Sequence, residues 1–271
     1  MSEATHIDYW AFRREGSDGS VGVLTFTRPP ANWMSMLAMT ELVERLEQVA
    51  EMAPEVKVLM LTGGVDGYFV AHADLDDLRE LGEGRLPAGD LGAWPKGLAL
   101  LESMPQPTVA AIDGQAWGGG CEISLACTMR VGSERSHMGQ PEVVVGIIPG
   151  AGGTQRLPRL VGQGIGAELC LSGRIVDADE ALRIGLLNAV LPAAGFVDKA
   201  VEWCEQISRN PAGAVFAAKR AVLGGGKLSL NDGLALEGGL FLEINASAEA
   251  RAANAAVLRP EDGGASDLGI G

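Results

Sequence analysis

The chain has 271 residues, of which 47% are apolar and 21% charged, and its formal net charge is −14. A chain of this length can bury a substantial core, and the composition is typical of a globular protein. The acidic balance excludes a general binder of nucleic acid or of anionic membranes, because either partner requires a basic surface. An anionic ligand held at one local site is not excluded.

The sequence carries no targeting signal that we recognise. Residues 1–6 contain neither a basic stretch nor a long apolar one, and no apolar run is long enough to span a bilayer. The four cysteines, at positions 121, 127, 170 and 204, form no C-x-x-C pair and are expected to be reduced, buried thiols. These features predict a cytoplasmic protein with no membrane or nucleic-acid partner.

Strand and helix patterns alternate along the first half of the chain. Short apolar or β-branched runs predict strands at 7–13, 21–26, 56–62 and 108–112. Apolar residues at helical spacing predict helices at 40–52, 74–81 and 98–104, and the run 82–92 predicts a surface loop. The alternation indicates an α/β fold.

Helices are expected to dominate from residue 153 onward. The patterns place them at 153–160, 164–171, 177–184, 196–208, 211–223 and 230–253. Residues 259–271 are rich in glycine and polar side chains, and we expect them to form a flexible tail.

Two glutamates lie in unusual glycine- or proline-containing contexts. Glu122 ends the run WGGGCE, and Glu142 ends the run GQPE. Two carboxyl groups in one apolar pocket can divide acid and base work, because burial and mutual repulsion separate their pKa values. The glycines before Glu122 allow backbone N–H groups to approach a ligand and to face developing negative charge.

These two segments resemble the signature of the crotonase superfamily and are most similar to its enoyl-CoA hydratase members. A third segment, YFVAHADL at 68–75, resembles the first oxyanion-hole loop of that family, and the resemblance extends over roughly residues 7–245. It implies a spiral of ββα units with two nearly perpendicular sheets, assigned here to residues 1–200. It also implies a helical region at 201–258 that builds homotrimers or homohexamers.

The resemblance also implies roles for particular residues. Glu122 and Glu142 match the two catalytic glutamates, and the backbone N–H groups of Ala73 and Gly119 match the oxyanion hole. The implied reaction is syn-addition of water to a 2-enoyl-CoA thioester. Glu142 would give the proton to the α-carbon, and both carboxyl groups would position the water. Coenzyme A enters as part of the substrate, and neither a metal ion nor another cofactor is expected.

Further residues are implied to contact the coenzyme A portion of the substrate. They are Ala31 at the nucleotide end and Ala71, His72, Asp74, Leu75 and Gly118 along the pantetheine arm. Asp74 has a second interpretation, because an aspartate at that place can cap the helix that follows it. His72 stands where the family usually has glycine. It points into solvent, contacts the ligand, or acts as a third acid–base group.

Two other functions remain open from the sequence. Enoyl-CoA isomerisation, or another crotonase reaction, needs one mobile proton shuttle, which Glu142 alone would provide. A non-catalytic acyl-CoA-binding protein would result if His72 disrupts the oxyanion loop. Other site classes are not indicated, since dinucleotide, P-loop and G-x-S-x-G motifs are missing and the histidines show no metal-ligand spacing.

Overall fold

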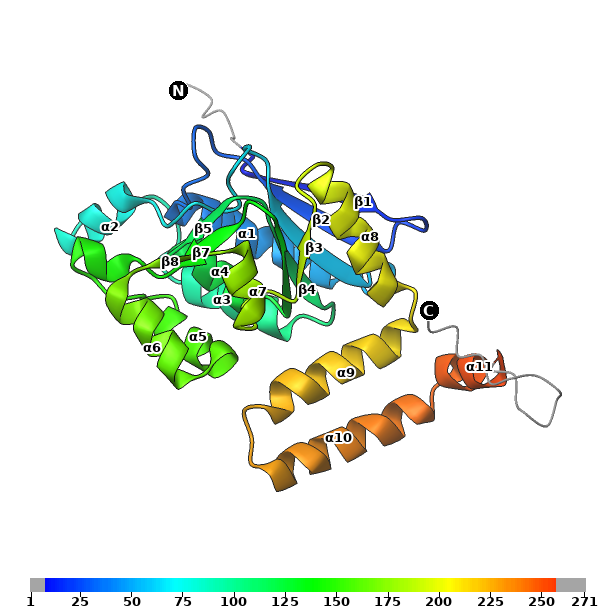
Figure 1. Ribbon diagram of the computed structural model, residues 1–271. Coiled ribbons are helices and arrows are strands. Elements are labelled where there is room, and N and C mark those ends of the chain that lie inside the picture. Colours follow the sequence, from blue (N-terminus) through cyan, green and yellow to red (C-terminus); the bar gives the residue numbers. More distant parts are fainter. Residues whose placement is uncertain (1–7, 257–271) are drawn as a thin grey trace. The chain divides into compact units, whose positions relative to one another are not determined.

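The computed structural model describes residues 8–256, which form two compact units divided after Gln206. The sequence-based expectation placed this division after residue 200, within the same helix. The expected tail at 259–271 lies outside the described residues. Figure 1 shows the course of the chain.

The first unit is built on a sheet of six strands in the order β1-β2-β3-β4-β6-β9. The strands are β1 Trp10–Glu15, β2 Val21–Phe26, β3 Val58–Gly63, β4 Thr108–Ile112, β6 Met129–Ser133 and β9 Ala189–Leu191. β1 and β2 form an antiparallel hairpin, and every later pair in the sheet is parallel. Parallel neighbours require crossover connections, and these connections carry the helices. The α/β class is therefore confirmed.

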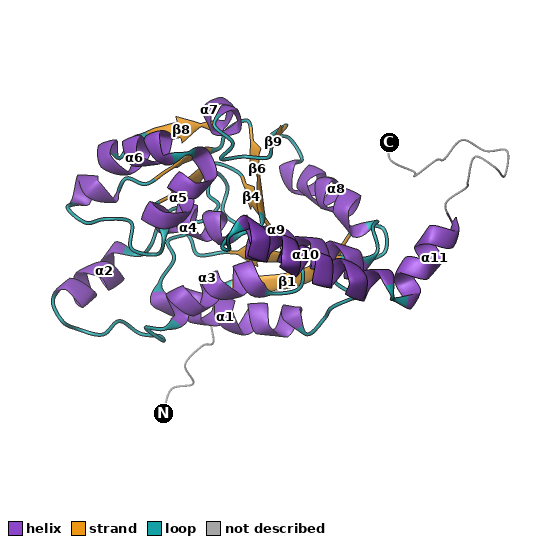
Figure 2. Ribbon diagram, turned by 90° about the horizontal axis from the view of Figure 1, so that it is seen from below, coloured by secondary structure: helices purple, strands orange, loops and turns teal. Residues whose placement is uncertain are grey.

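The helices of the first unit lie in the segments that connect and follow these strands. They are α1 Met36–Ala50, α2 Leu75–Gly82, α3 Ala93–Ser103, α4 Gly119–Ala126, α5 Gly153–Val161, α6 Gln163–Ser172, α7 Ala178–Arg183 and α8 Phe196–Ser208, with a short 3-10 helix η1 at Glu142–Val145. α1 and α3 pack against each other along one face of the sheet (Figure 2). The expected helices lie within a few residues of the observed ones.

A buried carboxylate joins β1 to α1. Glu41 on α1 accepts hydrogen bonds from the backbone N–H groups of Tyr9 at 2.8 Å and Trp10 at 3.1 Å. The Trp10 indole is fully buried and donates from Nε1 to the carbonyl of Ala38 at 3.0 Å. The polar groups at this edge of the core are thus paired, as burial requires.

A second, smaller sheet places the two glutamates next to each other. It contains β5 Gln115–Trp117, β7 His137–Gly139 and β8 Ile175–Asp177. β5 and β7 are parallel, with Trp117 opposite Gly139, and the N–H of Gly118 donates to the carbonyl of Gly139 at 2.9 Å. Because β5 leads into α4 and β7 leads into η1, this register brings the segments that carry Glu122 and Glu142 side by side.

The second unit is helical. Its helices are α9 Ala212–Gly225, α10 Leu230–Asn245 and α11 Ala248–Ala256, and α9 packs against α10. The single helix expected at 230–253 is interrupted, because α10 ends before Ser247, whose hydroxyl accepts the N–H of Ala250 and begins α11. Glu249 on α11 accepts the N–H groups of Ala212 at 2.8 Å and Gly213 at 3.0 Å, which caps α9.

Candidate active site

Glycines position Glu122 by allowing α4 to begin in a confined space. Gly118 has φ +50° and ψ −121°, a conformation that side chains rarely adopt, and a Cβ at this position would lie 2.9 Å from Glu142 Oε1. A Cβ on Gly120 would lie 1.9 Å from the carbonyl oxygen of Val70, so α4 packs directly on the 68–75 loop. The glycine run therefore sets the position of Glu122 at the start of α4.

Glu122 is buried, with 3% of its surface exposed. Its Oε1 accepts hydrogen bonds from the N–H groups of Ala151 at 2.7 Å and Gly153 at 2.8 Å. Burial raises the pKa of Glu122, while these two N–H groups and the Arg156 guanidinium act in the opposite direction, and the net pKa is above the usual value. The second carboxylate oxygen has no such backbone donors among the described residues.

Glu142 lies at the start of η1, directly after Pro141. The buried Gln140 amide, with its nitrogen toward the carboxylate, donates to Oε1 at 2.9 Å and to Oε2 at 3.2 Å. Burial raises the pKa of Glu142 to about 7, and the charge of Glu122 adds to the rise. A carboxyl group with this pKa can give up or accept a proton near neutral pH.

The backbone N–H groups of Ala73 and Gly119 lie next to each other. A Cβ on Gly119 would be 3.1 Å from the nitrogen of Ala73. Neither N–H has a hydrogen-bond acceptor among residues 8–256. The residues on either side of Ala73 are paired with Met34, which donates to the carbonyl of His72 and accepts from the N–H of Asp74. Gly119 is also the first residue of α4, so the positive end of that helix dipole faces the same place. Two unpaired N–H groups at a helix N-terminus can bind a developing oxyanion.

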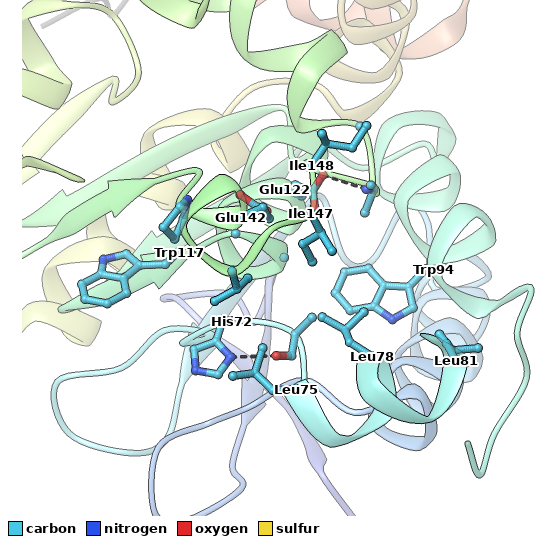
Figure 3. Close-up of a pocket in the computed structure, with 18 of the residues that line it drawn as sticks. His72, Leu75, Leu78, Leu81, Trp94, Trp117, Glu122, Glu142, Ile147 and Ile148 are labelled. Atoms are coloured by element: carbon cyan, nitrogen blue, oxygen red, sulfur yellow. Dashed lines mark hydrogen bonds between the residues drawn. The ribbon is translucent and has the colours of Figure 1, made fainter. Parts of the chain in front are cut away.

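All four of these groups border one cavity of about 800 Å³. Figure 3 shows Glu122 and Glu142 on one side of it, with His72, Leu75, Leu78 and Trp94 across from them. The cavity lining is largely apolar and includes leucines of α2, two tryptophans, and the valines and isoleucines of the 144–148 segment. A largely apolar cavity with a few converging polar groups is the expected form of a small-molecule site.

The structure brings together most, but not all, of the residues predicted from the sequence. Those that line the cavity are Glu122, Glu142, Ala73, Gly119, Gly118, His72 and Leu75. Ala31, Ala71 and Asp74 are not among its lining residues. Ala71 is fully buried, with its N–H bound to the carbonyl of Asn32 and its own carbonyl bound to the N–H of Trp117. Ala31 lies partly exposed in the turn after β2.

Asp74 caps α2, which is one of the two interpretations from the sequence. Its carboxylate accepts the N–H of Asp76 at 2.9 Å, and Arg28 binds it at 2.6 Å. Burial alone would raise the pKa of Asp74, but the hydrogen bonds and charge of Arg28 together with the Asp76 N–H outweigh it, and the net pKa is lowered. The carboxylate is thus engaged in the loop, and a direct ligand contact stays a prediction.

His72 does not strain the loop that carries it. Among the described residues, Asn32 is the one non-glycine with a positive φ, so His72 lies outside the left-handed region. Its Nδ1 is 2.7 Å from the carbonyl oxygen of Ala73, and its ring stacks on Trp33 with centroids 6.0 Å apart. Because a carbonyl oxygen only accepts, Nδ1 is the donor in this contact.

Several contributors to the site were not predicted from the sequence. They are Gln140, the Leu78 and Leu81 side chains, and the N–H groups of Ala151 and Gly153. The glycine-rich run at 150–153 was the available signal for the last two, because glycines permit close backbone approach. Cys121 adjoins Glu122 but is buried, and burial raises the pKa of its thiol to about 12, so it does not act as a nucleophile.

Within residues 8–256, no three His, Cys, Asp or Glu side chains are grouped closely enough to hold a metal ion. No helix in the same range is long and apolar enough to cross a membrane.

The chain is similar to known proteins over most of its length. Residues 16–258 match the sequence model of the family described as enoyl-CoA hydratase/isomerase. The chain is 39% identical over 229 residues to the short-chain-enoyl-CoA hydratase of Clostridium acetobutylicum, covering 83% of this chain and 86% of that protein. It is 36% identical over 224 residues to the crotonyl-CoA hydratase of Syntrophomonas wolfei, covering 82% and 85%. The crystal structure of an enoyl-CoA hydratase from Geobacillus kaustophilus superposes with a TM-score of 0.84 at 27% identity, covering 93% and 94%.

Proposed function

The chain belongs to the enoyl-CoA hydratase/isomerase family of the crotonase superfamily, and from this premise we propose that it is an enoyl-CoA hydratase, adding water across the 2,3 double bond of an acyl-CoA thioester. The main support for the proposal is that the groups needed for this reaction lie around one cavity. Two unpaired N–H groups, the buried Glu122 and the partly buried Glu142 border the same largely apolar space, and both carboxyl groups have raised pKa values. No metal ion or redox cofactor is part of the proposal.

The N–H groups of Ala73 and Gly119 are proposed to hold the thioester oxygen. When water adds to the β-carbon, electron density moves through the double bond and builds negative charge on that oxygen. Two N–H donors stabilise this charge without a compensating cation, and the loss of one typically costs about 10²–10³ in rate. Their adjacency and the absence of other acceptors in the described part of the chain support this role.

Glu142 is proposed as the proton donor to the α-carbon, with Glu122 as its partner in binding water. A pKa of about 7 leaves a substantial protonated fraction of Glu142 at neutral pH, which a donor needs. Glu122 is held by the N–H groups of Ala151 and Gly153, which stabilise its ionised form. An ionised Glu122 accepts a proton from water while Glu142 protonates carbon. The pair returns to its starting state after a proton moves between the two carboxyl groups through solvent.

Product analysis in ¹⁸O-labelled water tests this function. A 2-enoyl-CoA is expected to yield a 3-hydroxyacyl-CoA that carries one ¹⁸O atom. A 3-enoyl-CoA offered in parallel measures isomerisation, and conversion of it to the 2-enoyl form without ¹⁸O uptake would favour the isomerase alternative. Acyl-CoA binding with no conversion of either substrate would instead identify a binding protein and contradict the proposal.

We propose a homotrimer or a pair of trimers in the cytoplasm, with the second unit as the oligomerisation region. Molar mass from light scattering tests the assembly, and a monomer at micromolar concentration would contradict it. Fractionation of cells that express the protein tests the compartment.

A further inference from the structure

The cavity has two aliphatic walls that residues 8–256 leave exposed. One wall is the leucine face of α2, a helix in which no residue is buried. Its leucines are exposed to 52% at Leu75, 36% at Leu78 and 38% at Leu81. They recur at helical spacing on one side of α2, and all three line the cavity. An amphipathic helix normally turns such a face toward the core, but this helix turns it toward the site.

The opposite wall follows Glu142. It consists of Val144, Val145, Ile147 and Ile148, whose exposed fractions run from 43% to 72%. All four line the same cavity as the α2 leucines. In Figure 3 the Ile147 side chain points from this segment into the space between Glu142 and Leu78. Apolar surface of this extent inside a cleft indicates an apolar occupant.

Trp94 connects these walls to the proposed reaction centre. Its Cη2 atom would lie 2.8 Å from a Cβ on Gly119, so the six-membered ring is beside the proposed oxyanion hole. Figure 3 shows that ring facing the centre of the cavity, with the indole nitrogen turned away. A chain attached to a thioester held at Gly119 therefore meets Trp94 first and the leucines of α2 beyond it.

The lining offers no free permanent cation to a charged chain. Among the described residues that line the cavity, Arg156 is the one lysine or arginine, and its Nε is bound to Glu102 at 2.6 Å. A second nitrogen of Arg156 donates to the carbonyl of Ala151 at 2.9 Å. The other charged groups in the lining are the carboxyl groups of Glu122 and Glu142. A carboxylate on the acyl chain would thus lose hydration without gaining a counter-charge.

We infer that the preferred substrate carries an uncharged aliphatic or aromatic acyl chain longer than four carbons, seated between the leucine face of α2 and the 144–148 segment. This inference deepens the proposed function and rests on it for the position of the thioester. A four-carbon chain ends close to the reacting carbons and leaves both walls uncovered. Longer chains cover them, and burial of each methylene strengthens binding by about fourfold when it is complete.

Binding of saturated acyl-CoAs tests the inference independently of turnover, because these compounds have no double bond to hydrate. Isothermal titration with butanoyl-, hexanoyl- and octanoyl-CoA is expected to show affinity rising by about fivefold or more for each two carbons, because burial in an open cavity is incomplete and complete burial would give about sixteenfold. Adipoyl-CoA, which has six carbons and a terminal carboxylate, is expected to bind about tenfold or more weakly than hexanoyl-CoA.

Two variants separate the wall from general surface effects. Leu78→Ser removes a leucine from the wall and is expected to weaken the binding of octanoyl-CoA about four- to tenfold relative to the binding of butanoyl-CoA. Leu86→Ser is the matched control, because Leu86 is 75% exposed, lies only eight residues further along the chain and does not line the cavity. The control is expected to leave the ratio of the two affinities unchanged.

Three results would overturn the inference. The first is an affinity that is independent of chain length, and the second is adipoyl-CoA binding as tightly as hexanoyl-CoA. The third is coverage of the walls by a second copy, in which case Leu78→Ser would lower the molar mass in sedimentation and leave the chain-length series flat. Failure of the hydratase function has a different outcome, since acyl-CoAs would still bind with the same preference but no 2-enoyl-CoA would be hydrated.

Discussion

Replacement of Glu142 by glutamine is expected to change stability in a manner that depends on pH. Burial raises the pKa of Glu142 from 4.5 to about 7 in the folded protein. A carboxyl group that binds its proton more tightly when folded favours folding below its unfolded pKa, and this contribution is lost as the pH rises through the folded value. Wild type therefore loses stability between about pH 4.5 and pH 7 because of this one group. Glutamine has nearly the same shape and does not titrate.

The size of the effect follows from the shift and from the exposure of the side chain. At about 1.36 kcal/mol per pKa unit, the full shift corresponds to about 3 kcal/mol. Glu142 is only partly buried, so screening by water reduces this to about 1–2 kcal/mol. We expect Glu142→Gln to match wild type near pH 5 and to be more stable by about 1–2 kcal/mol near pH 8.

Urea unfolding followed by tryptophan fluorescence measures this difference, with protein concentration and ionic strength held constant. Glu44→Gln is the matched control, because Glu44 is exposed on α1 and far along the chain from the site. The control is expected to show no pH-dependent difference from wild type. A stability difference for Glu142→Gln that is the same at both ends of the pH range would refute the assignment of a raised pKa to this carboxyl group.

Two further substitutions test the packing around the site. Gly120→Ala places a Cβ 1.9 Å from the carbonyl oxygen of Val70 and is expected to destabilise the fold by about 2 kcal/mol or more. Gly164→Ala is the control, because a Cβ at this helical position meets no other atom, and it is expected to be neutral or stabilising by up to about 1 kcal/mol. Equal unfolding midpoints for the two variants would contradict the close packing of α4. Asp74→Ala removes the α2 cap and the partner of Arg28, with an expected loss of about 1–2 kcal/mol, and Asp74→Asn should recover part of it by keeping the cap. Thermal unfolding of the two variants measures this, and the cap has no role if asparagine recovers nothing.

The sequence predicts the main fold elements because their signals are local. Helical spacing in 40–52 and 74–81 gave α1 and α2 within a few residues, and the apolar runs gave β2, β3 and β4. The strands β5, β6, β7, β8 and β9 were missed. All of these except β6 have three residues, and runs this short carry no measurable period and form only where tertiary contacts align them. The pairing of β5 with β7, which aligns the two glutamates, was therefore invisible from the residues alone.

The candidate site was likewise predictable only where its residues form a local pattern in the sequence. Glu122, Glu142 and the glycine run were found because their types and spacing are unusual in one short region. The groups that hold Glu122 in place come from elsewhere in the chain, since Ala151 and Gly153 reach its carboxylate across about thirty residues. Residues 74–81, which include the leucines of α2, were predicted as a helix. No sequence pattern distinguishes an apolar helix face that packs on a core from one that lines a cavity.

The most direct test of the two-glutamate site is the loss of enoyl-thioester absorbance with wild type, Glu122→Gln and Glu142→Gln, measured on octenoyl- and butenoyl-CoA. The proposed role of both carboxyl groups predicts a fall in kcat of about 10²–10⁴ in each glutamate variant, with the Glu44→Gln control unchanged and acyl-CoA binding retained in all four proteins. Full turnover in either glutamate variant, in a protein that is folded and binds acyl-CoA, would contradict it.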